Sequence, residues 1–278
     1  MVRVICDSTG DLTPELIKKY DITIVPLNVH FGQETYRDGI DITADEFYRR
    51  LVSGGVHPTT SAPAPGTFLE AYHSLMQVTD EIIVLTISGG ISGTFESALQ
   101  AKNMLENPCN IEVIDTRLTC GGLFLPALRA AQAARQGEKL DGVAAMVRDV
   151  LKRTRAYMIF DTLEYLLKGG RIGRARALLG SMLKLNPIIT LEDGVIETVA
   201  KTRNRTRAKD ELFRLVDEAG GVEDLVLETA TAYEEMEEMF NRFTTILPPG
   251  RIYRSRVSPV IGVHTGPNVL AASFITRK

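Results

Sequence analysis

Hydroxyl-bearing residues gather in two loops in the first half of the chain. Asp7-Ser8-Thr9-Gly10-Asp11 directly follows an apolar run, and Thr59-Thr60-Ser61 lies between prolines. Asp and Ser side chains in a turn commonly bond to the local backbone. Hydroxyls in a loop that proline stiffens can instead donate to an anionic head group, and loops at the carboxyl ends of parallel strands are where α/β proteins bind ligands. Both interpretations, a surface turn and an anion site, stay open at this point.

A third cluster, Ser88-Gly89-Gly90-Ile91-Ser92-Gly93-Thr94, lies between an apolar run and a predicted helix. Glycine permits close approach of the backbone, and Ser92 is placed at or near the amino end of the helix, where N–H groups and the helix dipole favour an anion. Helix capping would explain Ser92 alone, but it requires neither of the two preceding glycines. The cluster therefore favours a ligand-binding loop.

Basic residues and glycines are interspersed in a fourth cluster, Lys168-Gly169-Gly170-Arg171-Ile172-Gly173-Arg174-Ala175-Arg176. Arg171 and Arg174 are three residues apart and can share one side of a helix, which fits either a solvated basic face or an anion site. Between Lys168 and Lys209 there are ten Lys or Arg and three Asp or Glu, a local balance of +7. The total charge of −3 therefore conceals a basic segment that suits an acidic partner surface or a phosphate.

Several enzyme signatures are missing from the sequence. No two glycines are separated by a single residue, which excludes a G-x-G-x-x-G dinucleotide loop. Neither a G-x-x-x-x-G-K-[ST] phosphate loop nor an H-E-x-x-H metal helix occurs. The nearest approach to a G-x-S-x-G hydrolase elbow begins at Gly90, and Thr94 replaces its last glycine. Self-contained catalysis is therefore poorly supported.

Length and composition are those of an ordinary globular chain. Its 278 residues are 44% hydrophobic and 24% charged, which excludes a disordered or fibrous protein, and the small net charge argues against a general nucleic-acid binder. The three cysteines form no C-x-x-C pair, and Asp7 interrupts the first apolar run too early for a signal peptide. These features favour a cytoplasmic setting. Residues 257–276 are uncharged but contain Pro259 and Pro267, so we expect strand–loop–strand and not a membrane span.

Short apolar runs alternate with amphipathic stretches in the first half. Strands are predicted at Val2–Cys6, Ile82–Ile87 and Ile111–Ile114. Helices are predicted to begin at Thr13-Pro14 and at the capping box Thr43-Ala44-Asp45-Glu46, and to span Ser92–Glu106, Thr119–Arg135 and Leu140–Arg153. Strand–helix alternation predicts an α/β domain over residues 1–157, with a largely parallel sheet and flanking helices.

The second half has a different pattern. We expect a hairpin in which the Asp193-Gly194 turn joins strands at Pro187–Leu191 and Val195–Val199. The other strands are predicted at Tyr157–Phe160, Asp224–Leu227, Arg251–Arg256 and Val260–Val263. Helices are predicted near Arg174–Leu185, Ala208–Ala219 and Tyr233–Thr244. This pattern predicts a second α/β domain, residues 158–278, with a mixed sheet and helices.

Taken together, these segments resemble the DegV family, fatty-acid-binding proteins of bacteria. The matching pieces, in chain order, are Asp7-Ser8-Thr9-Gly10-Asp11-Leu12, Thr60-Ser61, Ile91-Ser92-Gly93-Thr94, Lys168-Gly169-Gly170-Arg171-Ile172-Gly173, Asn186-Pro187-Ile188 and Gly262-Val263-His264-Thr265-Gly266-Pro267. The resemblance implies two α/β domains with one long, palmitate-like acyl chain buried at their junction, and no further cofactor or metal. It implies that the carboxylate is held by Thr60, Ser61, Ser92, Arg171, His264 and Thr265.

The resemblance also implies a division of labour. Such proteins catalyse no reaction themselves and present the carboxylate to a separate ATP-dependent fatty acid kinase, which makes the acyl phosphate for phospholipid synthesis. Arg174 and Arg203 occupy the positions that dock the kinase. Nucleic acid and an integral membrane segment are not expected as partners, whereas a transient membrane contact is. The chain departs from the family pattern at four positions, Ala62, Ala64, Gly89 and Asn268.

Two other functions stay open from the residues alone. A serine hydrolase or acyltransferase would use Ser92 as nucleophile and His264 as base, with Asp115 to orient the histidine. A regulatory or nucleic-acid module would work through the basic segment, although no RNP or helix-turn-helix signature is present.

Overall fold

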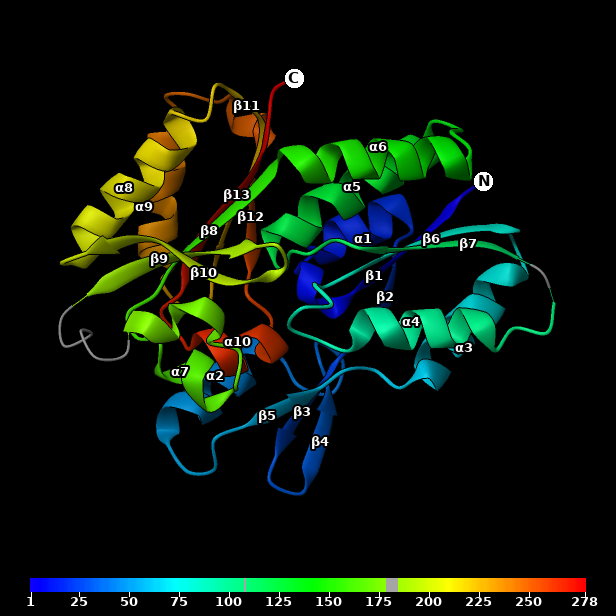
Figure 1. The fold of residues 1–278 in the computed structure, drawn as a ribbon, viewed down its shortest axis with the longest axis horizontal. Coiled ribbons are helices and arrows are strands. Elements are labelled where there is room, and N and C mark those ends of the chain that lie inside the picture. Colours follow the sequence, from blue (N-terminus) through cyan, green and yellow to red (C-terminus); the bar gives the residue numbers. More distant parts are fainter. Residues whose placement is uncertain (108, 179–184) are drawn as a thin grey trace.

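A four-stranded parallel sheet organises the first half of the chain (Figure 1). In the computed structural model, which describes residues 1–107, 109–178 and 185–278, the strand order is β2-β1-β6-β7 and every pair is parallel. The strands are β1 (Arg3–Asp7), β2 (Thr23–Val25), β6 (Glu81–Thr86) and β7 (Asn110–Asp115). The prediction of a largely parallel amino-terminal sheet is confirmed.

Helices cover both faces of this sheet. They are α1 (Pro14–Tyr20), α3 (Pro65–Met76), α4 (Thr94–Asn103), α5 (Gly121–Arg135) and α6 (Leu140–Arg153). One face packs against α3 and α4 around Phe68 and Tyr72, and the other packs against α1, α5 and α6 around Phe124. Because both faces are covered, β1 and β6 are largely apolar, and β1, β6 and β7 were predicted from the sequence, whereas the three-residue β2 was not.

A six-stranded mixed sheet organises the second half. Its order is β10-β9-β8-β13-β11-β12, in which only β11 and β12 are parallel. The strands are β8 (Thr154–Ile159), β9 (Asn186–Glu192), β10 (Val195–Thr202), β11 (Val222–Thr229), β12 (Ile252–Arg256) and β13 (Leu270–Thr276). Helices α8 (Arg205–Asp217) and α9 (Tyr233–Phe243) cover one face, and the 3-10 turn η3 (Pro249–Arg251) leads into β12. The predicted hairpin and mixed sheet are confirmed.

A small antiparallel sheet from the first half lies against the second half. It consists of β3 (Asn28–Phe31), β4 (Glu34–Arg37) and β5 (Thr59–Ser61), in the order β4-β3-β5. Together with α2 (Ala44–Ser53) it packs against α10 (Pro259–Thr265), which also contacts α7 (Glu164–Lys168) (Figure 1). The sequence analysis did not anticipate this sheet, because its strands have three or four residues and are largely polar.

One predicted strand was wrong. Residues 260–263 belong to helix α10, because Pro259 occupies the first helical position and almost every side chain of the helix is buried. A uniformly buried helix has no polar face, so its sequence resembles that of a buried strand. Of the helix predicted near residues 174–185, residues 173–178 form the 3-10 helix η2 (Gly173–Leu178), and residues 179–184 lie outside the described residues.

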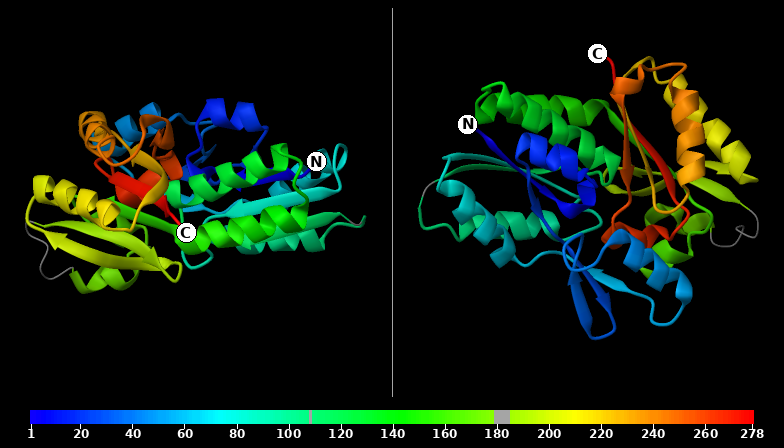
Figure 2. Two further views of the ribbon diagram at one scale, coloured as in Figure 1. Left: turned by 90° about the horizontal axis from the view of Figure 1, so that it is seen from above. Right: turned by 180° about the vertical axis from the view of Figure 1, so that it is seen from behind.

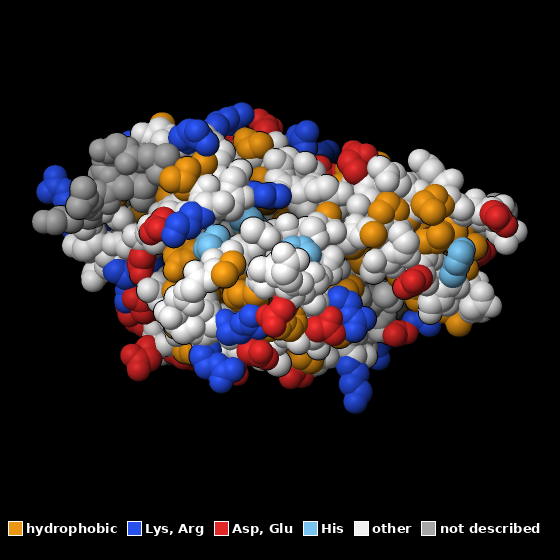
Figure 3. Space-filling model, turned by 90° about the horizontal axis from the view of Figure 1, so that it is seen from below, with side chains coloured by type: hydrophobic (Ala, Val, Ile, Leu, Met, Phe, Trp, Pro, Cys, Tyr) orange, Lys and Arg blue, Asp and Glu red, His pale blue; other side chains and the backbone are white. Residues whose placement is uncertain are grey.

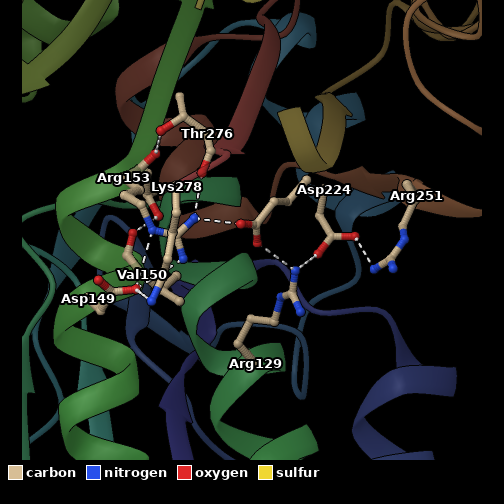
Figure 4. A network of polar contacts seen from close by, with 10 residues as sticks. Arg129, Asp149, Val150, Arg153, Asp224, Arg251, Thr276 and Lys278 are labelled. Atoms are coloured by element: carbon tan, nitrogen blue, oxygen red, sulfur yellow. Dashed lines mark hydrogen bonds and ion pairs between the residues drawn. The ribbon is translucent and has the colours of Figure 1, made fainter. Parts of the chain in front are cut away.

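Helix α5 lies between the two large sheets and joins them (Figures 1 and 2). In the middle of α5, Arg129 pairs with Asp224 of β11, which also pairs with Arg251 at 3.2 Å (Figure 4). Arg153 of α6 pairs with Glu223 at 2.8 Å. These contacts fix two helices of the first sheet to the start of β11 in the second. The predicted domain boundary at residues 157/158 falls inside β8 and stays a prediction.

Candidate functional site

A narrow, mostly apolar cavity lies where the two large sheets and the small sheet meet. It encloses about 560 Å³ between its lining atoms, including its open mouth. Its apolar lining comes from Leu27, Ile87, Ile91, Met158, Phe160, Leu166, Leu191, Ile196, Val260 and Ile261. Its polar lining comes from Thr9, Ser92, Thr119, Arg171, His264 and Thr265. The cavity therefore combines a mostly apolar lining with a small number of polar side chains.

His264, in the last turn of α10, is at the centre of the polar cluster. Its Nε2 lies 2.9 Å from Oγ1 of Thr60, and its Nδ1 is buried without a hydrogen-bond partner among the described residues. Burial, together with the positive charges of Arg171 and His57, lowers the pKa of His264 to about 4. The imidazole is therefore neutral at physiological pH, so one ring nitrogen is a donor and the other an acceptor.

Thr60 and Ser61 point in different directions because they are neighbours on β5. Side chains alternate between the two faces of a strand, and Thr60 faces α10. The Ser61 hydroxyl lies 3.0 Å from Nε2 of His30 and 3.4 Å from the amide nitrogen of Asn28, on the exposed face. The structure thus joins Thr60 to the cluster and turns the Ser61 side chain away from it.

Arg171 lies at the boundary between the cavity and the molecular surface. It lines both the apolar cavity and a neighbouring groove of polar character that is lined largely by glycines. Its Nε donates to the carbonyl of Ile91 at 3.2 Å, and Nη1 donates to the carbonyl of Gly169 at 2.8 Å. Two backbone carbonyls therefore fix the guanidinium, and its other N–H groups are left for a ligand.

Ser92 and Thr265 complete the polar lining. The Ser92 hydroxyl lies 2.8 Å from that of Thr94 and accepts the Thr94 backbone N–H at 3.3 Å. Gly93, and not Ser92, is the N-cap residue of α4, so Ser92 stands just before the helix. The buried Thr265 hydroxyl donates to the carbonyl of Ile261 at 3.2 Å.

Two glycines make the site possible by lacking side chains. A Cβ on Gly169 would lie 2.0 Å from His264 Nδ1, and a Cβ on Gly90 would lie 2.5 Å from the carbonyl oxygen of Gly194. That same carbonyl accepts a 2.7 Å hydrogen bond from Ser88. The tip of the β9–β10 hairpin is thereby fixed to the loop before α4. Glycine density in the sequence was the only sign of these contacts, and it did not reveal the partners.

The groups required by a serine hydrolase are not assembled. Among the described residues no hydrogen bond joins Ser92 to His264, because each bonds to a threonine instead. Asp115 accepts the backbone N–H groups of Gly89 at 3.1 Å and Arg117 at 2.8 Å, so it orders the loop and not the histidine. The geometry therefore does not assemble Ser92, His264 and Asp115 into a catalytic triad.

The two arginines expected to dock a partner are exposed but far apart. Arg174 in η2 lies 3.6 Å from Glu197 of β10, whereas Arg203 follows the far end of β10 and pairs with no residue in the described ranges. The six residues from Glu197 to Arg203 correspond to about 20 Å along the strand. On the face seen from below, acidic and basic side chains are intermixed (Figure 3). That face therefore carries no uniform basic surface.

Two features are absent from the described part of the chain. No helix there is long and apolar enough to cross a bilayer. No group of three or more His, Cys, Asp or Glu side chains there is placed to hold a metal ion.

Comparison with known proteins gives consistent matches over the full length. A family model described as "Uncharacterised protein, DegV family" matches residues 1–277. A DegV domain-containing protein of Caldanaerobacter subterraneus is 32% identical over 277 residues, covering 98% of each chain. A fatty-acid-binding DegV family protein of Thermus thermophilus has a TM-score of 0.92 at 28% identity, covering 99% of both chains. A stearic-acid-binding protein of Eubacterium ventriosum has a TM-score of 0.90 at 27% identity, covering 99% of this chain and 98% of that one.

Proposed function

This chain belongs to the DegV family, and on that premise we propose that it binds one long-chain fatty acid. The acyl chain would occupy the apolar cavity, and the carboxylate would lie against His264, Thr60, Arg171 and Ser92. Structural neighbours in the same family bind fatty acids, and one of them binds stearic acid. The observation that carries the proposal is a cavity whose lining is mostly apolar and also includes the polar side chains of Ser92, Arg171 and His264.

The energetics suit a binding protein. Burying each methylene contributes about 0.8 kcal/mol, so a palmitate-like tail supplies about 10 kcal/mol before the cost of association. The head group then has to avoid only the penalty of a buried, unpaired carboxylate. The Arg171 guanidinium supplies the opposite charge, and the neutral His264 and the Thr60 hydroxyl supply hydrogen bonds. Nothing in this arrangement needs a nucleophile.

The position of Arg171 suits presentation of the carboxylate to another protein. The groove beside Arg171 is bordered by Gly89, Gly90, Gly93, Gly170 and Gly173, so few side chains obstruct the approach from outside. We infer that a separate ATP-dependent fatty acid kinase reaches the carboxylate there, with Arg174 and Arg203 contacting it on either side. The protein itself would catalyse no step. We place this activity in the cytoplasm, in keeping with three free cysteines.

Lipid analysis tests the binding step. Purified protein, denatured and extracted, should yield one fatty acid per monomer by mass spectrometry, and delipidated protein should rebind it. A protein that is lipid-free and binds no fatty acid in solution would refute the proposal.

A reconstituted kinase assay tests the presentation step. Acyl phosphate should form only when kinase, ATP and this protein are all present. Arg203→Ala should lower the rate without changing fatty-acid affinity, whereas Lys201→Ala, an exposed neighbour on β10, should change neither. Equal rates for the two variants would exclude Arg203 from docking.

A further inference from the structure

Four carboxyl side chains are buried beneath the start of α10. Asp7 ends β1, Asp11 follows η1 (Ser8–Gly10), Asp38 follows β4, and Glu228 lies on β11. None of them forms an ion pair within the described ranges. Burial raises the pKa of Asp7 to about 6, of Asp38 to about 7 and of Glu228 to about 8, and it raises the pKa of Asp11 well above its usual value.

Two of these carboxyl groups hold the backbone that enters α10. Asp11 Oδ1 accepts the N–H of Ser258 at 3.1 Å, and Asp38 Oδ1 accepts the N–H of Val260 at 3.2 Å. Ser258 is the N-cap residue of α10, but its hydroxyl forms no capping hydrogen bond to the described residues. One residue earlier, the Tyr48 hydroxyl donates to the carbonyl of Val257 at 3.0 Å. Side chains from the first fifty residues therefore fix three positions at the start of α10.

Helix α10 connects these fixed positions to the head-group cluster. It has seven residues and is packed on every side, and a Cβ on Gly262 would lie 2.5 Å from the Tyr48 hydroxyl. His264 lies about 9 Å along the helix from Ser258, at the 1.5 Å rise of an α-helix. A buried segment this short moves as a unit, so a shift at its start displaces His264 from Thr60.

Resting on the fatty-acid-binding function proposed above, we infer that Asp11 and Asp38 are positioning residues of the head-group site. They act through α10, by holding Ser258 and Val260 so that His264 stays at Thr60. Neither residue lines the lipid cavity. What the role requires is one acceptor oxygen at a fixed place. The second oxygen, Oδ2, of each carboxyl group has no hydrogen-bond partner among the described residues.

The surroundings show why an amide is the conservative substitute. The buried titratable groups around the pair are Cys6, Asp7, Tyr48, Cys120 and Glu228, none of them cationic. Arg254 and Arg256 line the same pocket but pair with Glu237 and Asp45 instead. Because no cation pairs with Asp11 or Asp38, both are treated as neutral acids at pH 6, and the substitute should imitate a neutral carboxyl group. Asparagine keeps Oδ1 as an acceptor, whereas alanine removes it and leaves a buried N–H unpaired.

The experiment compares Asp11→Ala, Asp11→Asn, Asp38→Ala and Asp38→Asn with the wild type at pH 6. Fatty-acid affinity is measured on delipidated protein, and the His264 ring is followed by NMR of protein labelled with ¹⁵N-histidine. The alanine variants should weaken binding about tenfold or more and shift the His264 signals. The asparagine variants should bind within about threefold of the wild type and keep those signals.

Two controls separate positioning from general stability. Asp41→Ala removes an exposed carboxylate of the same turn, which accepts the backbone N–H of Arg37 but does not touch α10. Ser255→Ala removes a buried hydroxyl that donates to the carbonyl of Asp11, so it lowers stability nearby without freeing the helix. Both should leave the His264 signals in place.

Each outcome bears on the inference. Alanine variants with wild-type affinity and unmoved His264 signals would overturn it, and so would asparagine variants as defective as alanine. If an alanine variant does not fold, the glutamate variant replaces it, because the longer side chain displaces the acceptor and should move the same signals. Binding by the wild type is measured first. A wild-type protein that binds no fatty acid would refute the proposed function itself.

Discussion

An alanine at position 169 would place a methyl group where the imidazole of His264 now lies. Gly169 follows α7 with a φ of −77°, an ordinary value, so the backbone accepts alanine without strain. The new Cβ would lie 2.0 Å from Nδ1 of His264, which must move by about 1.4 Å before it reaches the 3.4 Å of ordinary van der Waals contact. The ring cannot make that movement and keep its 2.9 Å contact with Thr60.

The expected losses follow from this displacement. A hydrogen bond to a charged group is worth about 1.5–3 kcal/mol, so losing the His264 contact with the carboxylate should weaken fatty-acid binding about 10- to 150-fold. Overpacking a close-fitted site costs about 1–3 kcal/mol, so the free energy of unfolding should fall by that amount. Because Arg171 also donates to the Gly169 carbonyl, a shift of that backbone would add to the loss of affinity.

The assay is titration of delipidated Gly169→Ala with a fluorescent fatty acid, together with urea unfolding. Gly66→Ala is the matched control, because a Cβ at Gly66, in the first turn of α3, meets nothing within 4 Å. The control should keep its affinity and its stability. If Gly169→Ala behaves like Gly66→Ala in both measurements, the packing of His264 against Gly169 does not determine binding, and the head-group geometry given above is wrong.

Three further predictions address the same site and the core beside it. Thr60→Val removes the hydroxyl bonded to His264 and should weaken fatty-acid binding about 3- to 30-fold in the same titration, whereas Ser61→Ala, on the opposite face of β5, should leave affinity unchanged. A fluorophosphonate probe should not label Ser92, since no base contacts its hydroxyl, and labelling seen by intact mass would revive the hydrolase interpretation. Glu228 holds its proton more tightly in the folded than in the unfolded state, because burial raises its pKa from 4.5 to about 8. Its contribution to stability is therefore complete below pH 4.5 and is lost as the pH rises through about 8, by up to about 1.4 kcal/mol per pH unit. In Glu228→Gln, the free energy of unfolding, measured by urea titration, should depend less steeply on pH between pH 5 and 8. An unchanged pH dependence would contradict burial as the cause of the raised pKa of Glu228.

The elements that the sequence predicted correctly are those whose hydrophobic pattern is plain in the sequence. The β1 and β6 strands are buried on both faces and appear as uninterrupted apolar runs, and α6, amphipathic with one buried face, was placed at its observed bounds. The prediction failed where burial removed the periodic pattern, as in α10, and where strands were short and polar, as in β5. Both failures fell on elements that carry the head-group cluster.

The sequence could name candidate residues of the site but could not show in which direction their side chains point. Arg171 and His264 line one cavity, as the resemblance implied, but the opposite orientations of Thr60 and Ser61 depend on β5 being a strand. The contacts of Asp11 and Asp38 join residues more than 200 positions apart, and no local pattern carries that information. The roles of these residues in binding stay predictions until the variants are measured.

The small sheet has a consequence for the order in which the site forms during synthesis. Thr60 and His264 are 204 residues apart, and α10, the element against which β3, β5 and α2 pack, leaves the ribosome long after those three elements. The parallel sheet can form from the first half of the chain, because its strands all precede residue 116. Residues 28–61 have no α10 to pack against at that stage. The proposed head-group cluster therefore cannot form in a nascent chain before α10 has been synthesised, and a fragment ending before α10 should carry no fatty acid.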